Sequence, residues 1–143
     1  MTAAPIRATV LNPGQCRAPA LVLDEPLSFW GGFDPVHGTI IDRHHPQRGA
    51  CIAGRVLVMP GSRGSAGTPA AIAEAIRRGV GPVAVLLGGR DVNIAIGAMV
   101  ADRLYGNAVP VLAVAPEDYP RLHTGDEITI AVDGTIMIGT GPR

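Results

Sequence analysis

The loop at residues 61–68 is the strongest candidate for chemistry in this sequence, with glycine at three of its eight positions. It joins the end of an apolar, strand-like segment to a segment with helical spacing that opens with Pro69. In open α/β sheets, ligands bind beside loops of this kind. Its glycines allow close backbone approach, the free N–H groups at a helix start favour a carboxylate or phosphate, and arginine can grip either group. The predicted substrate-binding residues are Arg63, Gly64, Ala66 and Gly67.

The hydroxyl of Ser65 belongs to the same loop, and the positive end of the helix dipole would stabilise its alkoxide. The loop lacks the lysine of a P-loop, the spacing of a dinucleotide fingerprint and the flanking pattern of a serine-hydrolase nucleophile. The motif therefore predicts an anion site without naming a reaction. An ordinary strand-to-helix turn is the alternative.

Two adjacent histidines, His44 and His45, form a second candidate. Neighbouring side chains point to opposite sides of an extended chain, so a surface or hinge role is favoured over joint metal binding. A phosphohistidine carrier is the alternative. His37 and His123 each have an aspartate three residues away, but no third ligand is near in sequence. We predict no metal site in this chain.

An aromatic loop at residues 29–33 holds the only tryptophan and both phenylalanines between glycines. Such a cluster forms either a local core or an interface patch. The sequence favours neither interpretation.

Composition excludes several classes of protein. The chain has 143 residues, of which 47% are apolar, so it is long enough for one domain with a real core. Twelve basic and twelve acidic residues give no net charge, which argues against nucleic-acid binding. Every basic residue is arginine, which excludes Schiff-base lysine chemistry.

Only two cysteines are present, Cys16 and Cys51. Two thiols are too few for an iron–sulfur cluster, so we expect none bound by this chain alone. The early apolar stretch at residues 8–11 is short, and no later run reaches membrane-spanning length. We expect no membrane association, a cytoplasmic location and no disulfide.

Periodicity predicts an α/β domain with a parallel core and β-rich ends. Residues 52–115 alternate strand and helix, which implies right-handed crossovers; the predicted elements are strand 52–59, helix 69–78, strand 83–87, helix 93–104 and strand 109–115. Thr68 is the expected N-cap of the first helix. Further strands are expected at 6–11, 20–23 and 38–42, and a hairpin at 127–132 and 135–138 turns at Asp133-Gly134.

An ordered series of segments resembles the aconitase X swivel-domain, or small-subunit, family. The match runs from about residue 20 to 114 and more loosely to the end; the segments that carry it are 26–34, 38–46, 54–60, 63–65, 74–82 and 104–106. One departure is that Ala66 follows Ser65, where the family usually has another hydroxyl.

The resemblance implies one swivelling β/β/α domain over residues 1–143 that closes over an iron–sulfur site on a large subunit. It implies dehydration of a small hydroxy acid, cis-3-hydroxy-L-proline in the first place and mevalonate 5-phosphate in the second. It assigns the proton-accepting role to Ser65. The residues agree, because dehydration beside a carboxylate needs a base and a Lewis acid, and the second must come from a partner.

Overall fold

The computed structural model of the chain describes residues 4–64 and 66–139, so Ser65 lies outside the described residues. The strands are β1 (Ile6–Arg7), β2 (Thr9–Asn12), β3 (Cys16–Val22), β4 (Val56–Met59), β5 (Ala84–Leu87), β6 (Val111–Ala113), β7 (Glu127–Ile130) and β8 (Thr135–Gly139). The helices are α1 (Thr68–Arg77), α2 (Val92–Tyr105) and a short 3-10 turn, η1 (Tyr119–Arg121). Within the described ranges, no helix has the length and apolarity needed to cross a bilayer.

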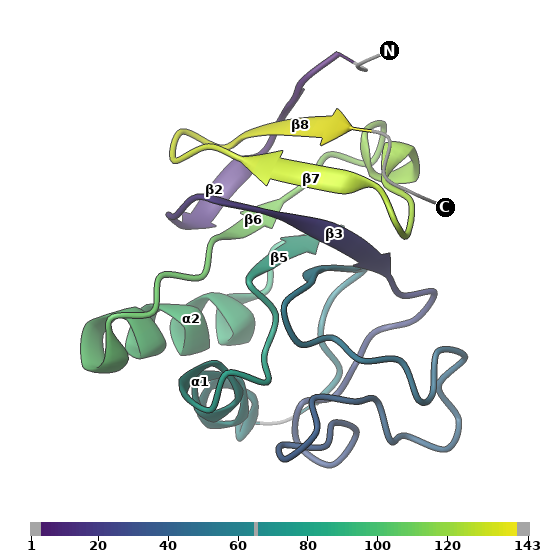
Figure 1. Cartoon of the computed structure of the whole chain (residues 1–143), viewed down its shortest axis with the longest axis vertical. Helices are drawn as coiled ribbons and strands as arrows, with labels where there is room; N and C mark the ends of the chain where they lie inside the picture. The colour runs from purple at the N-terminus through teal and green to yellow at the C-terminus, as the bar shows by residue number, and fades with distance from the viewer. Residues whose placement is uncertain (1–3, 65, 140–143) are drawn as a thin grey trace.

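Three layers make up the molecule, and they confirm the predicted β/β/α arrangement. Figure 1 shows the β7–β8 hairpin on one side, the central strands in the middle, and α1 and α2 together on the other side. The described strands pair in the order β1-β8-β7-β3-β4-β5-β6-β2. Strands β3 to β6 run parallel, and the two outer pairs are antiparallel.

The two edges of this sheet are joined by one residue. Strands β1 and β2 are separated only by Ala8, yet β1 pairs with β8 and β2 pairs with β6. The Ala8 N–H donates to the carbonyl of Gly134 over 3.1 Å at the junction. The sheet is therefore curled nearly into a barrel, which removes most of its open edges.

The near-continuous apolar strands are buried on both faces, as their sequence predicts. In β4, Leu57 and Met59 pack in the cluster beneath the helices. Val56 and Val58 alternate with them and pack with the hairpin strands in a second cluster. Strand β5 alternates in the same way, so each parallel strand contributes to two cores.

Two expectations about strands are wrong. The strand at 38–42 is absent among the described residues, where only isolated bridges join Thr39 to Cys51 and Ile40 to Phe33. Gly38 has φ +73°, which breaks an extended run before it can pair. Strand β4 begins at Val56 instead of residue 52, because Gly54 is also left-handed.

Candidate functional site

The 61–68 loop leaves the carboxyl end of β4 and enters α1, where the sequence places it. Its first half is held from one side by the irregular segment before β4. Leu27 forms a parallel bridge with Ser62, and the Arg63 N–H donates to the carbonyl of Leu27 over 3.0 Å. Leu27 is fully buried, so this side of the loop rests on the core.

Asp91 holds the same half of the loop from the other side. One carboxylate oxygen accepts from the N–H of Ile94 over 3.2 Å, which caps α2. The other accepts from both the N–H and the hydroxyl of Ser62, over 2.7 and 2.5 Å. Asp91 thus ties the loop to the start of α2. This contact was not predicted from the sequence, although an aspartate before a helical run is a capping signal.

Arg63 lies at the start of the loop with its guanidinium about half exposed. The carboxylate of Glu25 lies 3.5 Å from this guanidinium. An exposed pair at that separation is weak, so the guanidinium remains available to a stronger anionic partner. Substrate binding by Arg63 stays a prediction.

Gly64 of this loop lies close to the buried hydroxyl of Thr68. Gly64 has φ +136°, and a Cβ at its position would lie 3.3 Å from Ser28 Oγ and 3.4 Å from Thr68 Oγ1. Ser28 Oγ donates to the carbonyl of Trp30. Thr68 is fully buried, and its hydroxyl has no hydrogen-bond partner among the described residues. An unpaired buried hydroxyl is costly, which marks this position as one that favours a bound polar group.

Thr68 is not the helix cap that the sequence predicts. The N-cap is Gly67, whose lack of a side chain leaves the helix start without a side-chain cap, and Thr68 is the first helical residue. The first turn of α1 also contains no acidic residue. The structure brings Gly64, Ala66 and Gly67 to this helix N-terminus, where N–H groups and the dipole favour an anion. Their contact with a substrate remains a prediction, and Ser65 lies outside the described residues.

The two histidines have opposite environments, as their adjacency predicts. His44 is exposed, whereas His45 is only 4% exposed. The His45 Nδ1 accepts from the Gln47 N–H over 3.0 Å, and its Nε2 lies 3.1 Å from the carbonyl of Glu25. Both ring nitrogens are occupied, which makes His45 a poor phosphoryl carrier.

The aromatic loop combines both interpretations that the sequence leaves open. Phe29 and Phe33 are buried in the core, with ring centroids 5.2 Å apart. Trp30 is 67% exposed and, with Ala70 and Ala71 of α1, lines a groove of about 500 Å³. The local-core interpretation is therefore confirmed for the two phenylalanines, and an interface at the exposed Trp30 stays a prediction.

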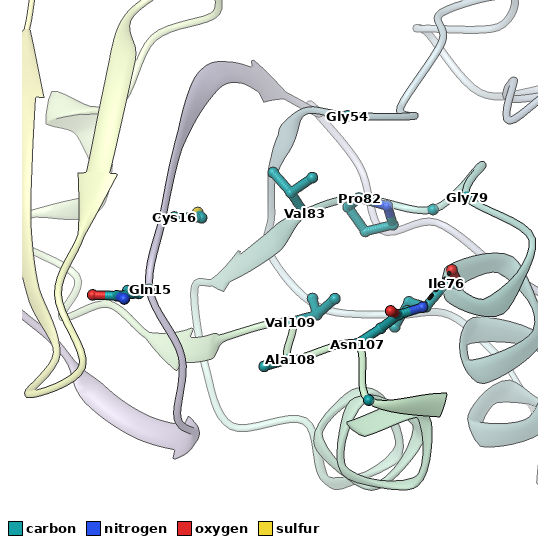
Figure 2. Close-up of a pocket in the computed structure, with 12 residues that line it drawn as sticks. Gln15, Cys16, Gly54, Ile76, Gly79, Pro82, Val83, Asn107, Ala108 and Val109 are labelled. Atoms are coloured by element: carbon teal, nitrogen blue, oxygen red, sulfur yellow. Dashed lines mark hydrogen bonds between the residues drawn. The ribbon is translucent and has the colours of Figure 1, made fainter. Parts of the chain in front are cut away.

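A separate pocket of about 440 Å³ lies at the opposite ends of the parallel strands. Its wall includes Gly54, Pro82 and Val109, which come shortly before β4, β5 and β6, and it also contains Cys16 (Figure 2). These are the amino ends of the strands, whereas ligands in open α/β sheets bind at the carboxyl ends. The 61–68 loop is therefore the better candidate site.

The described residues do not fit an iron–sulfur cluster. They contain no group of three or more His, Cys, Asp or Glu side chains placed to hold a metal. The two cysteines are both free, with Cys16 in β3 and Cys51 in the irregular segment before β4.

The two thiols are expected to differ in reactivity. Burial raises the pKa of Cys16 to about 11 from an ordinary value of 9.0, whereas Cys51 is exposed. The thiolate is the nucleophile, so at pH 8 Cys16 stays protonated and iodoacetamide should modify Cys51 first. Peptide mass spectrometry of the folded chain measures this, and unfolding in urea should remove the difference. Equal rates in the folded chain would contradict the burial of Cys16.

Comparison with known proteins identifies the family to which these features belong. The family model for the aconitase X swivel domain matches residues 5–138. The chain belongs to the aconitase X swivel-domain family. Its fold matches the crystal structure of Thermococcus kodakaraensis aconitase X in the holo-form, with a TM-score of 0.84 and 28% identity, covering 95% of this chain and 98% of that chain.

Relatives of this swivel domain carry two different activities. A cis-3-hydroxy-L-proline dehydratase of Pseudomonas aeruginosa is 42% identical over 101 residues, which are 71% of this chain and 17% of that protein. A phosphomevalonate dehydratase small subunit of Methanothermobacter thermautotrophicus is 40% identical over 124 residues, which cover 87% of this chain and 89% of that subunit. The chain thus spans about a fifth or less of the hydroxyproline dehydratases and nearly all of the small subunit.

Proposed function

We propose that this chain is the small subunit of an aconitase-X-type hydro-lyase that dehydrates a small hydroxy acid together with a large subunit. Its family supports this role, and so does the match to a small-subunit relative, which the chain covers over 89% of that relative's length. We take residues 1–143 as one swivelling domain. In this proposal the domain closes over a site whose remaining groups, the iron–sulfur cluster included, belong to the large subunit.

The observation that carries the proposal is the buried hydroxyl of Thr68 beneath Gly64, which has no hydrogen-bond partner among the described residues. It lies at a helix N-terminus without acidic residues, beside a half-exposed arginine. These groups share one preference, for an anion that accepts hydrogen bonds. A carboxylate or phosphate of the substrate meets that preference, and both proposed substrates carry such a group.

In the proposed reaction, Arg63 and the amides of Gly64, Ala66 and Gly67 hold the substrate's anionic group. Ser65 Oγ then takes the proton from the carbon next to the carboxylate. Its alkoxide form is favoured by the dipole of α1 and the nearby guanidinium. The cluster on the large subunit would supply the Lewis acid for the departing hydroxide.

The proposed substrate is cis-3-hydroxy-L-proline. The Pseudomonas aeruginosa relative, which is 42% identical to this chain, is named for its dehydration. Mevalonate 5-phosphate is the second candidate. It is favoured by the coverage of a separate small subunit of nearly the same length. Most contacts that choose between them would lie on the large subunit.

Turnover is expected to need both chains. Co-expression with the proposed large subunit, followed by anaerobic assay on cis-3-hydroxy-L-proline, should give dehydration that neither purified chain gives alone, because the described residues of this chain offer no site for a Lewis-acid metal. Activity of the isolated chain would overturn the two-subunit proposal. An iron-containing complex that turns over only mevalonate 5-phosphate would keep the family role and change the substrate.

A further inference from the structure

A turn at residues 45–47 makes hydrogen bonds to residues 24–25, which belong to the segment that supports the 61–68 loop. The Gln47 N–H donates to His45 Nδ1 over 3.0 Å, and a backbone amide can only donate. Nδ1 must therefore be the unprotonated acceptor. The imidazole proton is then on Nε2, which donates to the carbonyl of Glu25 over 3.1 Å. This arrangement requires the neutral imidazole in a single tautomer.

Gln47 holds the neighbouring residue of the same segment. The N–H of Asp24 donates to Gln47 Oε1 over 3.1 Å, and Gln47 Nε2 donates to Asp24 Oδ2 over 2.8 Å. With the imidazole bond, three side-chain hydrogen bonds fix the backbone and side chain of residues 24–25. The imidazole bond is the buried one of the three, because Gln47 and Asp24 lie nearer the surface.

The segment that contains Glu25 contacts the 61–68 loop at Leu27, two residues further along the chain. Leu27 accepts the Arg63 N–H and bridges Ser62, and the side chain of Glu25 lies 3.5 Å from the Arg63 guanidinium. Movement of the Glu25 backbone would therefore displace both supports of Arg63. The aspartate at 91 would keep Ser62 in place from the other side, so the loop would shift in part and not collapse.

We propose that His45 is a positioning residue for Arg63 and the 61–68 loop, acting through Glu25 and Leu27 as a neutral imidazole. Its importance for catalysis rests on the proposed function. Its effect on the position of the loop does not. The charged or titratable groups along these contacts are Asp24, Glu25 and Arg63, and Asp42, Arg43, His44 and Arg48 lie within three residues of His45 in the chain.

The effect of losing the His45 imidazole can be measured without disrupting the backbone turn that contains it. The His45 N–H donates to the Asp42 carbonyl and the His45 carbonyl accepts from Arg48, and any residue keeps these backbone bonds. Asparagine can also accept the amide two residues on, as in an Asx turn. His45→Asn thus keeps the local turn and removes the longer reach to Glu25. His44→Asn, at the exposed neighbour, is the matched control.

The first test needs neither substrate nor partner. Long-range ¹H–¹⁵N spectra of the full chain near pH 7.5 should show His45 protonated at Nε2 only. In His45→Asn, the amide signals of Ser62, Arg63 and Gly64 should move, whereas His44→Asn should leave them in place. A different protonation of His45, or unmoved loop amides in His45→Asn, overturns the inference. Gln47→Met removes the two more exposed hydrogen bonds to Asp24 and should move the same amide signals by a smaller amount. This variant keeps the inference testable if His45→Asn does not fold.

The second test uses the two-subunit complex. His45→Asn is expected to lose about tenfold in kcat/KM, mostly through a higher KM, since a displaced arginine weakens substrate binding. An unchanged KM alongside shifted loop amides would confine His45 to a structural role and overturn its part in catalysis. If the wild-type complex turns over neither substrate, the proposed function fails, while the spectra still decide whether His45 positions the loop.

Discussion

Ser65→Ala is expected to lower kcat of the two-subunit complex by about a hundredfold to ten-thousandfold, the usual contribution of a positioned general base. Elimination beside a carboxylate cannot begin until the carbon-bound proton has an acceptor, and alanine offers none. The supports that the structure describes for this loop are Leu27, Asp91 and the buried start of α1. KM, partner binding and thermal stability should therefore change little. Steady-state kinetics and a melting curve of the complex measure these together.

Ser62→Ala is the matched control, with the same chemical change in the same loop. It removes the hydroxyl bond to Asp91 but keeps the backbone bond to the same carboxylate. One hydrogen bond contributes about 1 kcal/mol, so the loss of activity should be about tenfold or smaller. Near-wild-type turnover by Ser65→Ala would rule out the proposed base. Equal losses in both variants would attribute the effect to loop integrity.

Gly97→Ala is expected to destabilise the fold by about 1–3 kcal/mol, the usual cost of overpacking a well-packed core. Gly97 lies on the face of α2 that meets α1, and a Cβ there would clash with Ile72 Cγ2 and lie 2.8 Å from the carbonyl oxygen of Pro69. Ile72 is fully buried and β-branched, and Pro69 belongs to a helix backbone, so neither can yield easily. The strain also falls on the first turn of α1, directly after the 61–68 loop.

Gly89→Ala is the control for this prediction. A Cβ at Gly89 meets no atom within 4 Å, and its φ is not in the left-handed region, so its stability should stay near that of the wild type. Each kcal/mol lowers the melting temperature by about 3 °C for a chain of this size, which thermal denaturation resolves. Alanine favours a helix interior over glycine by about 1 kcal/mol. A Gly97→Ala variant more stable than wild type would show that propensity outweighs the clash and would contradict the close packing of the helices.

Local pattern was sufficient for much of the fold. The apolar runs around Leu57 and Val85 predict doubly covered strands, because only a strand buried on both faces lacks alternation. The two helices, the crossovers and the hairpin at Asp133-Gly134 follow from spacing and turn residues that act within a few positions. Each of these elements is confirmed, with boundaries shifted by a few residues.

The irregular segment before β4 is where local pattern fails. Ile40 and Ile41 have the residue types of a strand, but Gly38 and Gly49 adopt left-handed conformations that interrupt pairing. The order of the edges is also not readable from the sequence. Strands β1 and β2 are two halves of one apolar stretch, and only closure of the sheet sends them to different partners.

The sequence by itself determined the family, the layered fold and the loop in which chemistry is expected, because those depend on short-range spacing and on an ordered series of motifs. Only the tertiary structure decided which residues support that loop. Asp91 and Leu27 contact Ser62 from distant positions in the chain, and His45 contacts Glu25, whose side chain lies beside Arg63. No periodicity in the sequence links these residues to the loop. Tertiary packing also decided the role of Thr68. Its residue type favours a helix cap, but Gly67 is the N-cap, and the Thr68 hydroxyl is buried where α1 packs against the core.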